Sequence, residues 1–191
     1  MEKVSIRIPD FLLRGISLLA ASGDIRYYLE SVLIEATATE TRVTATDGRC
    51  LGTIAHETAN SGIPDEGVQL IVPMAAIKAI RKTRIRDAIT LFIEPVSDTH
   101  SGITWGDGGA MFKPIEAKYP EWRKVIPEEP SGEAAQFNPA LLMKFVKVQK
   151  ALSGAGEDRY FPRVHHNGHA GALVKLALVP NFTGVVMPVR M

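Results

Sequence analysis

The chain has 191 residues and a mass of 20.8 kDa, the size of one large domain or of one domain with a further fragment. Hydrophobic residues make up 46% and charged residues 23%, which excludes disordered, collagen-like and low-complexity proteins. No apolar run approaches the roughly 18 residues of a membrane span. The single cysteine, Cys50, cannot form an internal disulfide or a thiol-based metal framework. We therefore expect a cytoplasmic protein that makes no membrane contact.

The formal net charge of +1 hides an uneven distribution of basic residues. Residues 74–86 and 139–152 carry eight basic residues and no acidic one, so the rest of the chain holds 14 basic and 21 acidic residues. The eight are Lys78, Arg81, Lys82, Arg84, Arg86, Lys144, Lys147 and Lys150. Two basic helices on a mildly acidic body favour contact with a polyanion. The alternative is two ordinary solvated helix faces, because lysine and arginine are good helix formers.

One pattern occurs three times along the chain, at intervals of 64 and 66 residues. A short apolar or alternating run ends at Pro9, at Pro73 and at Pro139, and a helical pattern follows each proline. Proline suits the first turn of a helix, where its missing N–H costs nothing. Asn138 can serve as the N-cap of the third helix. We expect a helix after each proline, the second continuing through the basic run to Arg86.

Runs that favour β-strands follow each helix. They span 27–39 and 41–57, then 88–96 and 101–117, then 171–179 and 183–191. Asp-Gly pairs at 47–48 and 107–108 predict hairpin turns at matching places in the first two copies. Each copy is therefore a β-α-β-β unit with room for one more strand, in an α+β fold. Such a unit rarely buries its apolar face alone, so two copies pair and the third has no partner within the chain.

The segment 127–136 is rich in proline, glutamate and glycine, as a domain junction is. We predict a complete domain over residues 1–127, built from half-units of about 1–63 and 64–127. Residues 128–191 then form a third, half-domain unit. A second loose stretch, 153–169, predicts a mobile surface loop between the third helix and its strands.

Candidate catalytic and metal-binding motifs are weak in this sequence. His165, His166 and His169 could hold a metal on a helix, but the glycines around them favour an exposed loop. The glycine-rich stretch 106–110 lacks the lysine of a phosphate-binding loop and favours a hairpin turn. Cys50 is expected to be a buried structural thiol. We predict no enzyme activity, no cofactor and no metal site. A hydrolase or metal protein that uses the three histidines remains the distant alternative.

Five stretches resemble the bacterial DNA polymerase III beta subunit, the sliding clamp, in the right order and over most of the chain. They are DIRYYLESVLIE at 24–35, ATDGRCL at 45–51, KYPEWRKVIP at 118–127, FNPALLMKF at 137–145 and VVMPVRM at 185–191. The resemblance implies the DNA clamp fold, in which repeated β-α-β-β-β half-units pair into domains with helices on one face of antiparallel sheets. It also implies a non-catalytic ring around duplex DNA that tethers polymerase and other replication or repair proteins.

In this family, partners insert a short peptide into an apolar pocket between the middle and last domains. Carried over by position, the pocket residues are Arg26, Leu29, Thr46, Gly48, Leu51, Pro120, Lys124, Val125, Asn138, Val185, Val186, Met187, Pro188, Val189, Arg190 and Met191. Four positions depart from the family pattern. Arg49-Cys50 replaces His-Arg, Lys124 replaces an arginine, and Met191 replaces a leucine.

The resemblance covers the middle domain and the second half of the third domain. The residues expected to face DNA are Arg14, Lys78, Arg81, Lys82, Arg84, Arg86, Lys144, Lys147 and Lys150. The chain holds about three half-units, where a bacterial clamp chain holds six and a ring holds twelve. We therefore expect a homo-oligomer, with a tetramer favoured, in which the third unit finds its partner in another copy. The alternative is an adaptor or decoy that keeps the peptide pocket without forming a ring.

Overall fold

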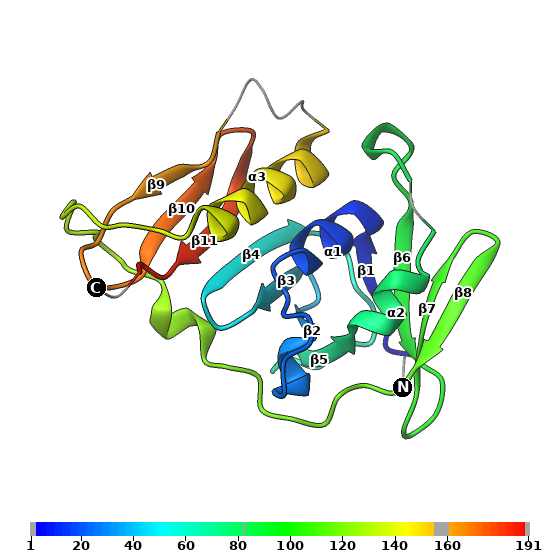
Figure 1. Ribbon diagram of the computed structural model, residues 1–191. Coiled ribbons are helices and arrows are strands. Elements are labelled where there is room, and N and C mark those ends of the chain that lie inside the picture. Colours follow the sequence, from blue (N-terminus) through cyan, green and yellow to red (C-terminus); the bar gives the residue numbers. More distant parts are fainter. Residues whose placement is uncertain (1–2, 82, 155–160, 190–191) are drawn as a thin grey trace.

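Two antiparallel β-sheets and the helices packed against them make up the described part of the chain, residues 3–81, 83–154 and 161–189 of a computed structural model (Figure 1). One sheet has four strands in the order β1-β6-β7-β8. The other has seven strands in the order β5-β2-β3-β4-β11-β10-β9. This is the α+β arrangement that the sequence predicts.

The first unit contains β1 (Ile6–Pro9), α1 (Asp10–Ser17), a 3-10 turn η1 (Tyr27–Leu29), β2 (Ser31–Ala36), β3 (Glu40–Thr46) and β4 (Cys50–Glu57). Helix α1 begins directly after Pro9 and buries Leu12, Leu13 and Ile16 against the sheet. Asp47 and Gly48 form the hairpin turn between β3 and β4, as predicted. Gly48 takes a φ of 85°, a conformation in which glycine is the favoured residue.

The second unit contains β5 (Val68–Pro73), α2 (Met74–Ala79), a 3-10 turn η2 (Ile85–Asp87), β6 (Thr90–Pro95), β7 (Ser101–Trp105) and β8 (Gly108–Phe112). The prediction that its helix reaches Arg86 is wrong, because α2 ends at Ala79 and Ile80 is already extended. A run of basic residues with no acidic neighbour repels itself along a helix, and Ile80, Thr83 and Ile85 are β-branched. Lys82 lies outside the described residues.

The third unit contains α3 (Pro139–Ser153), β9 (Arg163–His165), β10 (Ala172–Leu176) and β11 (Val179–Val186). The Asn138 side chain accepts a hydrogen bond from the Ala140 N–H at 2.9 Å, which confirms the predicted N-cap. The prediction of one loose loop over 153–169 is wrong for residues 163–165, which pair as β9 with β10. Residues 155–160 of that stretch lie outside the described residues.

The first two units exchange their opening strands. Strand β5 of the second unit lies beside β2 of the first, and β1 of the first unit lies beside β6 of the second. Each sheet therefore contains strands from both units, and the pair folds as one body. This is the physical form of the pairing that the repeat predicts.

The third unit joins the first by strand pairing and by helix packing. Strand β11 pairs antiparallel with β4, with Gly184 opposite Gly52, so one sheet runs through both units. Helix α3 packs beside α1, where Gly15 allows close approach: a Cβ at this position would lie 2.5 Å from a methyl group of Leu152. The domain boundary that we predict at residue 127 remains a prediction, and the seven-stranded sheet spans it.

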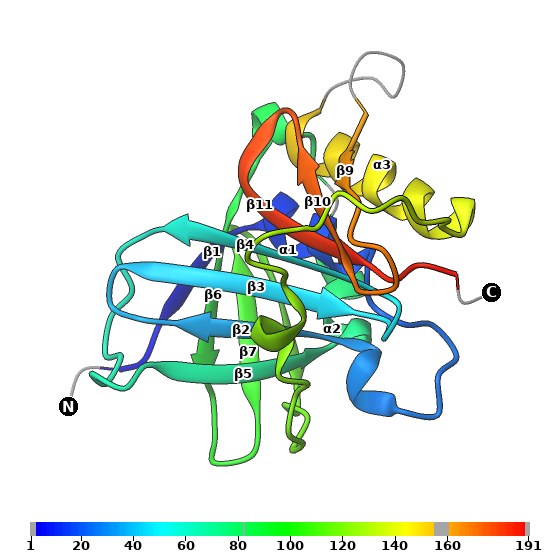
Figure 2. The ribbon, with the colours of Figure 1, turned by 90° about the vertical axis from the view of Figure 1, so that its left-hand side faces the viewer.

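The two faces of the long sheet carry different elements. Figure 2 shows the strands β2 to β5 in front of the helices, with the connection from β8 to α3 crossing over the strands. This connection includes η3 (Trp122–Val125) and buries Tyr119 and Trp122 against Leu33, Leu51 and Val185. The helices therefore cover one face, and the connection covers part of the other.

Candidate functional site

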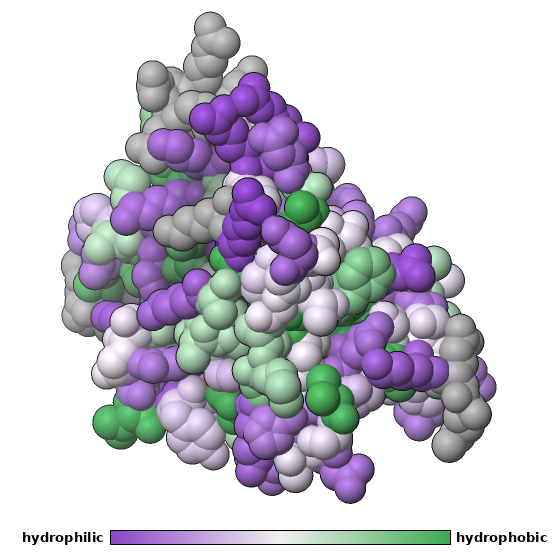
Figure 3. Space-filling model, turned by 90° about the vertical axis from the view of Figure 1, so that its right-hand side faces the viewer, coloured by the Kyte–Doolittle hydropathy of each residue, from purple (hydrophilic) through white to green (hydrophobic). Residues whose placement is uncertain are grey.

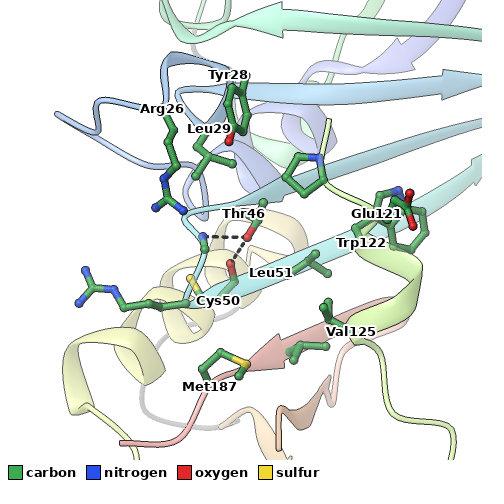
Figure 4. A pocket seen from close by; sticks show the side chains of 14 residues that line it. Arg26, Tyr28, Leu29, Thr46, Cys50, Leu51, Glu121, Trp122, Val125 and Met187 are labelled. Carbon is green, nitrogen blue, oxygen red and sulfur yellow. Dashed lines mark hydrogen bonds between the residues drawn. The ribbon is translucent and has the colours of Figure 1, made fainter. Parts of the chain in front are cut away.

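A cavity of about 260 Å³ opens where η1, the β3–β4 turn, η3 and the end of β11 meet (Figure 4). We call it the pocket. It is lined by Arg26, Tyr28, Leu29, Thr46, Gly48, Arg49, Cys50, Leu51, Pro120, Glu121, Trp122, Val125, Val185 and Met187. Its floor is apolar, whereas Arg26, Arg49 and Glu121 supply charged groups at its rim. An apolar slot with a few polar groups is the usual form of a site that anchors a small ligand or a short peptide.

The turn between β3 and β4 is fixed by its own hydrogen bonds. Thr46 Oγ1 donates to the carbonyl oxygen of Cys50 at 2.7 Å and accepts from the Gly48 N–H at 3.0 Å (Figure 4). The Asp47 carboxylate accepts hydrogen bonds from the Arg49 and Cys50 N–H groups at 2.8 and 2.7 Å. This wall of the pocket is therefore formed before any ligand arrives.

Asp47 also ties the turn to helix α3. Its second carboxylate oxygen lies 2.7 Å from Lys144 Nζ, and Asp47 is itself buried. Burial would raise the pKa of Asp47, but the hydrogen bonds from Lys144 and from the backbone N–H groups outweigh it and lower the pKa. The ion pair therefore links the first unit to the third at the edge of the pocket.

Arg26 is held in place by Asp24. The Arg26 guanidinium donates two hydrogen bonds to this carboxylate, at 3.0 and 2.8 Å, and these lower the pKa of Asp24 to about 2. Gly48 faces this guanidinium, since a Cβ at residue 48 would lie 3.1 Å from a guanidinium nitrogen. The positive φ therefore favours glycine here, and a larger residue would also displace the Arg26 guanidinium slightly.

Two of the lining residues, Cys50 and Trp122, have structural roles. Burial raises the pKa of the Cys50 thiol to about 12, so it stays protonated near neutral pH and is a poor nucleophile. The Trp122 indole N–H donates to the partly buried Glu35 carboxylate at 3.1 Å, and Arg123 stacks on the ring at 4.1 Å. The indole therefore holds η3 against the sheet beside the pocket.

A larger hollow of about 1280 Å³ lies on the helix side of the molecule, between α1, α2, the 80–86 segment and the end of α3. We call it the basic hollow. Its charged lining residues are Arg14, Lys78, Arg84, Arg86 and Lys150, among the apolar side chains of Phe11, Leu18, Met74, Ile77, Ile80 and Ile85. No acidic side chain lines it within the described residues. Such a surface attracts polyanions.

Comparison with curated proteins finds beta sliding clamps. The chain is 28% identical over 120 residues to the one from Proteus mirabilis, a match that covers 63% of this chain and 32% of that protein. The match to the Salmonella typhimurium protein is 25% over 119 residues, covering 62% and 31%. The chain thus spans about a third of the length of the curated relatives that it matches. No protein-family model matches the sequence.

Comparison with solved structures covers nearly the whole chain. The Pseudomonas aeruginosa DNA polymerase sliding clamp superimposes with a TM-score of 0.70 and 20% identity, over 98% of this chain and 67% of that one. A putative DNA polymerase III beta subunit from Eubacterium rectale gives 0.68 at 12% identity, over 98% and 66%. The chain has the sliding-clamp fold. Its sequence is similar to the two curated beta sliding clamps over 62–63% of its length.

The fold brings together many of the pocket residues that the sliding-clamp resemblance predicts. Nine of them line the pocket: Arg26, Leu29, Thr46, Gly48, Leu51, Pro120, Val125, Val185 and Met187. Five described residues of that set do not line it. Lys124 is exposed beside Glu121, Asn138 caps α3, and Val186 points into the core. Pro188 and Val189 continue past the pocket, and Arg190 and Met191 lie outside the described residues.

Sequence reasoning missed Tyr28, Arg49, Cys50, Glu121 and Trp122 as lining residues. Each lies inside or next to a stretch that resembles the clamp. A carry-over from the family keeps only the positions that match its motif, and therefore passes over neighbours such as Tyr28. Cys50 was expected to be buried, and both Cys50 and Trp122 are buried, at 3% and 5% exposure, while still forming part of the pocket wall.

The residues expected to face DNA fall into two groups. Arg14, Lys78, Arg84, Arg86 and Lys150 line the basic hollow, whereas Lys147 and Arg81 are exposed outside it. Arg14 is held by an ion pair with the buried Asp10 and a hydrogen bond to the Thr83 carbonyl oxygen. Lys144 is held by Asp47. Arg14 and Lys144 are therefore structural cations in this chain.

The histidine cluster does not form a metal site in the described part of the chain. No three His, Cys, Asp or Glu side chains gather there in a way that could hold an ion. His166 Nδ1 accepts the Ala135 N–H at 3.0 Å, and its ring packs edge-on against Phe137. His165 and His169 are exposed. Separately, the described helices include none long and apolar enough to span a bilayer.

Proposed function

We propose that the chain is a sliding-clamp-like protein that holds duplex DNA on its helix side and binds short peptides of replication or repair proteins in the pocket. The observation that carries this proposal is the separation of the two sites. The basic hollow lies among the helices, and the pocket adjoins η3 on the opposite face of the long sheet. Both can be occupied at once, which a tether between DNA and a protein requires.

The pocket suits an apolar peptide with an acidic residue nearby. Leu29, Leu51 and Val125 offer an apolar slot, and Met187 closes one side (Figure 4). Burial of one leucine-sized side chain contributes about 1.5–3 kcal/mol. Arg26 at the rim remains half-exposed while paired with Asp24, so it can also accept an acidic group of a peptide.

The basic hollow suits phosphate groups rather than bases. Lys78, Arg84 and Arg86 are exposed, and lysine and arginine side chains of this kind contact a DNA backbone without reading its sequence. Contacts of this kind weaken steeply as salt rises, because binding releases condensed counterions. The chain would then hold DNA by charge and by enclosure, with no chemical step.

Enclosure of DNA requires several copies, and we favour four. The third unit pairs with the first through β11, but at its other edge no strand from another unit lies beyond β9 in the described residues, whereas the first two units exchange strands. In place of such a strand, residues 131–136 fold back, with Gly132 N–H donating to the His166 carbonyl oxygen. Pairing of two third units would complete a domain, and four chains would supply the twelve half-units of the family's ring.

Light scattering and topological DNA retention test this proposal together. We expect a mass near four times 20.8 kDa at moderate salt. We also expect retention on nicked circular DNA through gel filtration, and release when that DNA is cut to a linear form. A mass of 20.8 kDa at every concentration would contradict a DNA-encircling clamp. Equal dissociation from circular and from linear DNA would contradict it as well.

A second candidate is an adaptor or decoy that binds peptides without a ring. One observation favours it: residues of one copy are enough to enclose a cavity of about 260 Å³. A fluorescent peptide Gly-Asp-Leu-Leu-Gly-Ser, compared with a version carrying lysine for its aspartate, serves as the probe. Binding of the acidic peptide by a protein that does not retain circular DNA identifies the adaptor. Absence of binding to either peptide contradicts both candidates.

A further inference from the structure

The strands of the three units are arranged in the same way. Each unit ends in a three-stranded antiparallel meander, which is β2-β3-β4 in the first, β6-β7-β8 in the second and β9-β10-β11 in the third. The closing strands are therefore β4, β8 and β11. Two of them pair with each other, since β4 lies antiparallel to β11 across the junction between units. In this chain, a closing strand pairs with a closing strand.

Strand β8 is the closing strand left over. It lies at the end of its sheet and pairs only with β7 among the described residues. No described strand or helix pairs with its outer edge, and Met111, next to its central residue Ala110, is 66% exposed. Figure 3, viewed from the side on which β7 and β8 lie in Figure 1, shows weakly hydrophobic residues across the middle of this face with purple residues around them. An open apolar edge of this kind is a template for another strand.

We infer that β8 pairs antiparallel with β8 of a second copy, about a two-fold axis that passes between the two Ala110 residues. This isologous contact follows the rule seen within the chain, because only another copy can supply a further closing strand. It deepens the assembly of the proposed clamp, but it rests on strand pairing and not on DNA or peptide binding.

The sequence of β8 is self-complementary in this register. Met111 of one copy lies opposite Gly109 of the other, so a large exposed side chain covers a residue that has none. Two positions further out on the same face, Asp107 in the β7–β8 turn of one copy lies opposite Lys113, just after β8, of the other, at both ends of the contact. Opposite charges facing each other across an antiparallel pair are stabilising. Ala110 packs toward the core side and meets its own copy at the centre.

The flanking charges are available for this exchange. Asp107 lies 3.9 Å from Arg81, and Lys113 lies 3.6 Å from Glu116, with all four side chains at least 60% exposed. Exposed ion pairs of this kind contribute little, so a change of partner costs little. The other free edge, β9, is a poorer partner for β8. It opens its meander instead of closing it, and the folded-back residues 131–136 already reach the 166–168 segment that follows β9.

Cysteine cross-linking tests the register directly. In full-length protein, Ala110→Cys should form a disulfide-linked dimer under mild oxidation, because facing Cα atoms about 4.5–5.5 Å apart suit a disulfide. Gly109→Cys or Met111→Cys alone should remain unlinked, since their own copies are about 7–8 Å apart on the diagonal. An equal mixture of these two variants should cross-link. The unmodified chain, whose Cys50 is buried, is the control.

Sedimentation equilibrium tests the contact without cross-links. Met111→Lys should raise the dissociation constant of this contact at least tenfold and halve the assembled mass. Val96→Lys is the matched control, because Val96 is similarly exposed at 57% but lies off the edge. Equal masses for both variants, or cross-linking of Met111→Cys alone, overturn the inference. Peptide binding is measured in parallel, so that a failed β8 contact is not mistaken for a failed pocket.

Discussion

In the pocket, Arg26 is held by two hydrogen bonds to Asp24, and the Asp47 turn is fixed by its backbone and by Lys144. In the basic hollow, Lys78 and Arg84 extend exposed from a short helix and from the irregular segment after it. One site holds its charges in fixed positions, and the other presents them loosely. A fixed site can select a ligand by shape. A loose cationic surface suits a polyanion whose sequence does not matter.

The largest expected effect comes from reversing charge in the basic hollow. Changing Lys78, Arg84 and Arg86 together to glutamate should weaken DNA binding on the order of 100-fold near 0.1 M salt, because three phosphate contacts are lost. The slope of log affinity against log salt should fall by about 2 to 3. Fluorescence anisotropy with a labelled duplex across a salt series measures both.

The control for that variant changes three exposed cations away from the hollow, Lys3, Lys118 and Arg163, to glutamate. Both variants change the net charge by the same amount. Any difference in DNA affinity between them is therefore due to where the substituted residues lie. If both lose the same affinity, DNA is attracted by total charge and the basic hollow has no special part.

The next effect lies in the pocket and should leave DNA binding unchanged. Val125→Glu places a carboxylate in an apolar wall, so we expect at least a tenfold loss of peptide affinity. Val189→Glu is the matched control, because the two valines are 48% and 47% exposed and Val189 does not line the pocket. Anisotropy of the labelled peptide compares them. Equal losses would contradict the pocket as the binding site.

A smaller effect concerns stability and depends on pH. Asp47→Asn removes the ion pair with Lys144 and should lower the free energy of unfolding at pH 7 by about 1–2 kcal/mol. The folded pKa of Asp47 is below its ordinary value of 3.8, so its contribution is present above that value and is lost as pH falls through the folded pKa. Urea unfolding should therefore show that the difference in unfolding free energy between the two proteins shrinks as the pH falls below about 4. If the difference in unfolding free energy does not change with pH, the destabilisation is due to altered packing and not to the ion pair.

The smallest effect is expected at Lys124. The clamp resemblance assigns it to the pocket, but its side chain is 78% exposed and lies beside Glu121. Lys124→Ala should change peptide affinity less than twofold, because an exposed charge of this kind is screened by solvent. A tenfold loss in the same peptide titration would return Lys124 to the site and show that η3 moves when peptide binds.

The sequence contained the repeat, and so it predicted the fold class. It gave no sign that the third unit joins the first through β4 and β11. The local signals were strong: prolines before each helix, Asp-Gly at the turns, and an asparagine cap that the structure confirms at Asn138. Where the prediction went wrong, tertiary context was decisive. Strand β9 is three residues long and exists because β10 offers it a partner, which no local pattern records. The end of α2 at Ala79 reflects charge repulsion along a run that favours a helix by composition.

The pocket was predicted in outline through the resemblance, but its finer features depend on contacts distant in sequence. Asp47 and Lys144 are 97 residues apart, and nothing in either stretch indicates that they meet. The same holds for Glu35, which receives the Trp122 indole N–H from 87 residues away. Such pairs are set by the fold, and only the assembled sheet brings them together.

The exchange of opening strands has a consequence for how the chain is made. Strand β1 pairs with β6, so Ile6 lies opposite Ile93, and β1 cannot enter its sheet until β6 has been synthesised. During that interval its apolar residues, later buried, are exposed to other chains. Closing so long a loop is also slow. Strand β1 therefore depends for its sheet partner on a segment made much later, and until then its apolar side chains are a site at which nascent chains can aggregate.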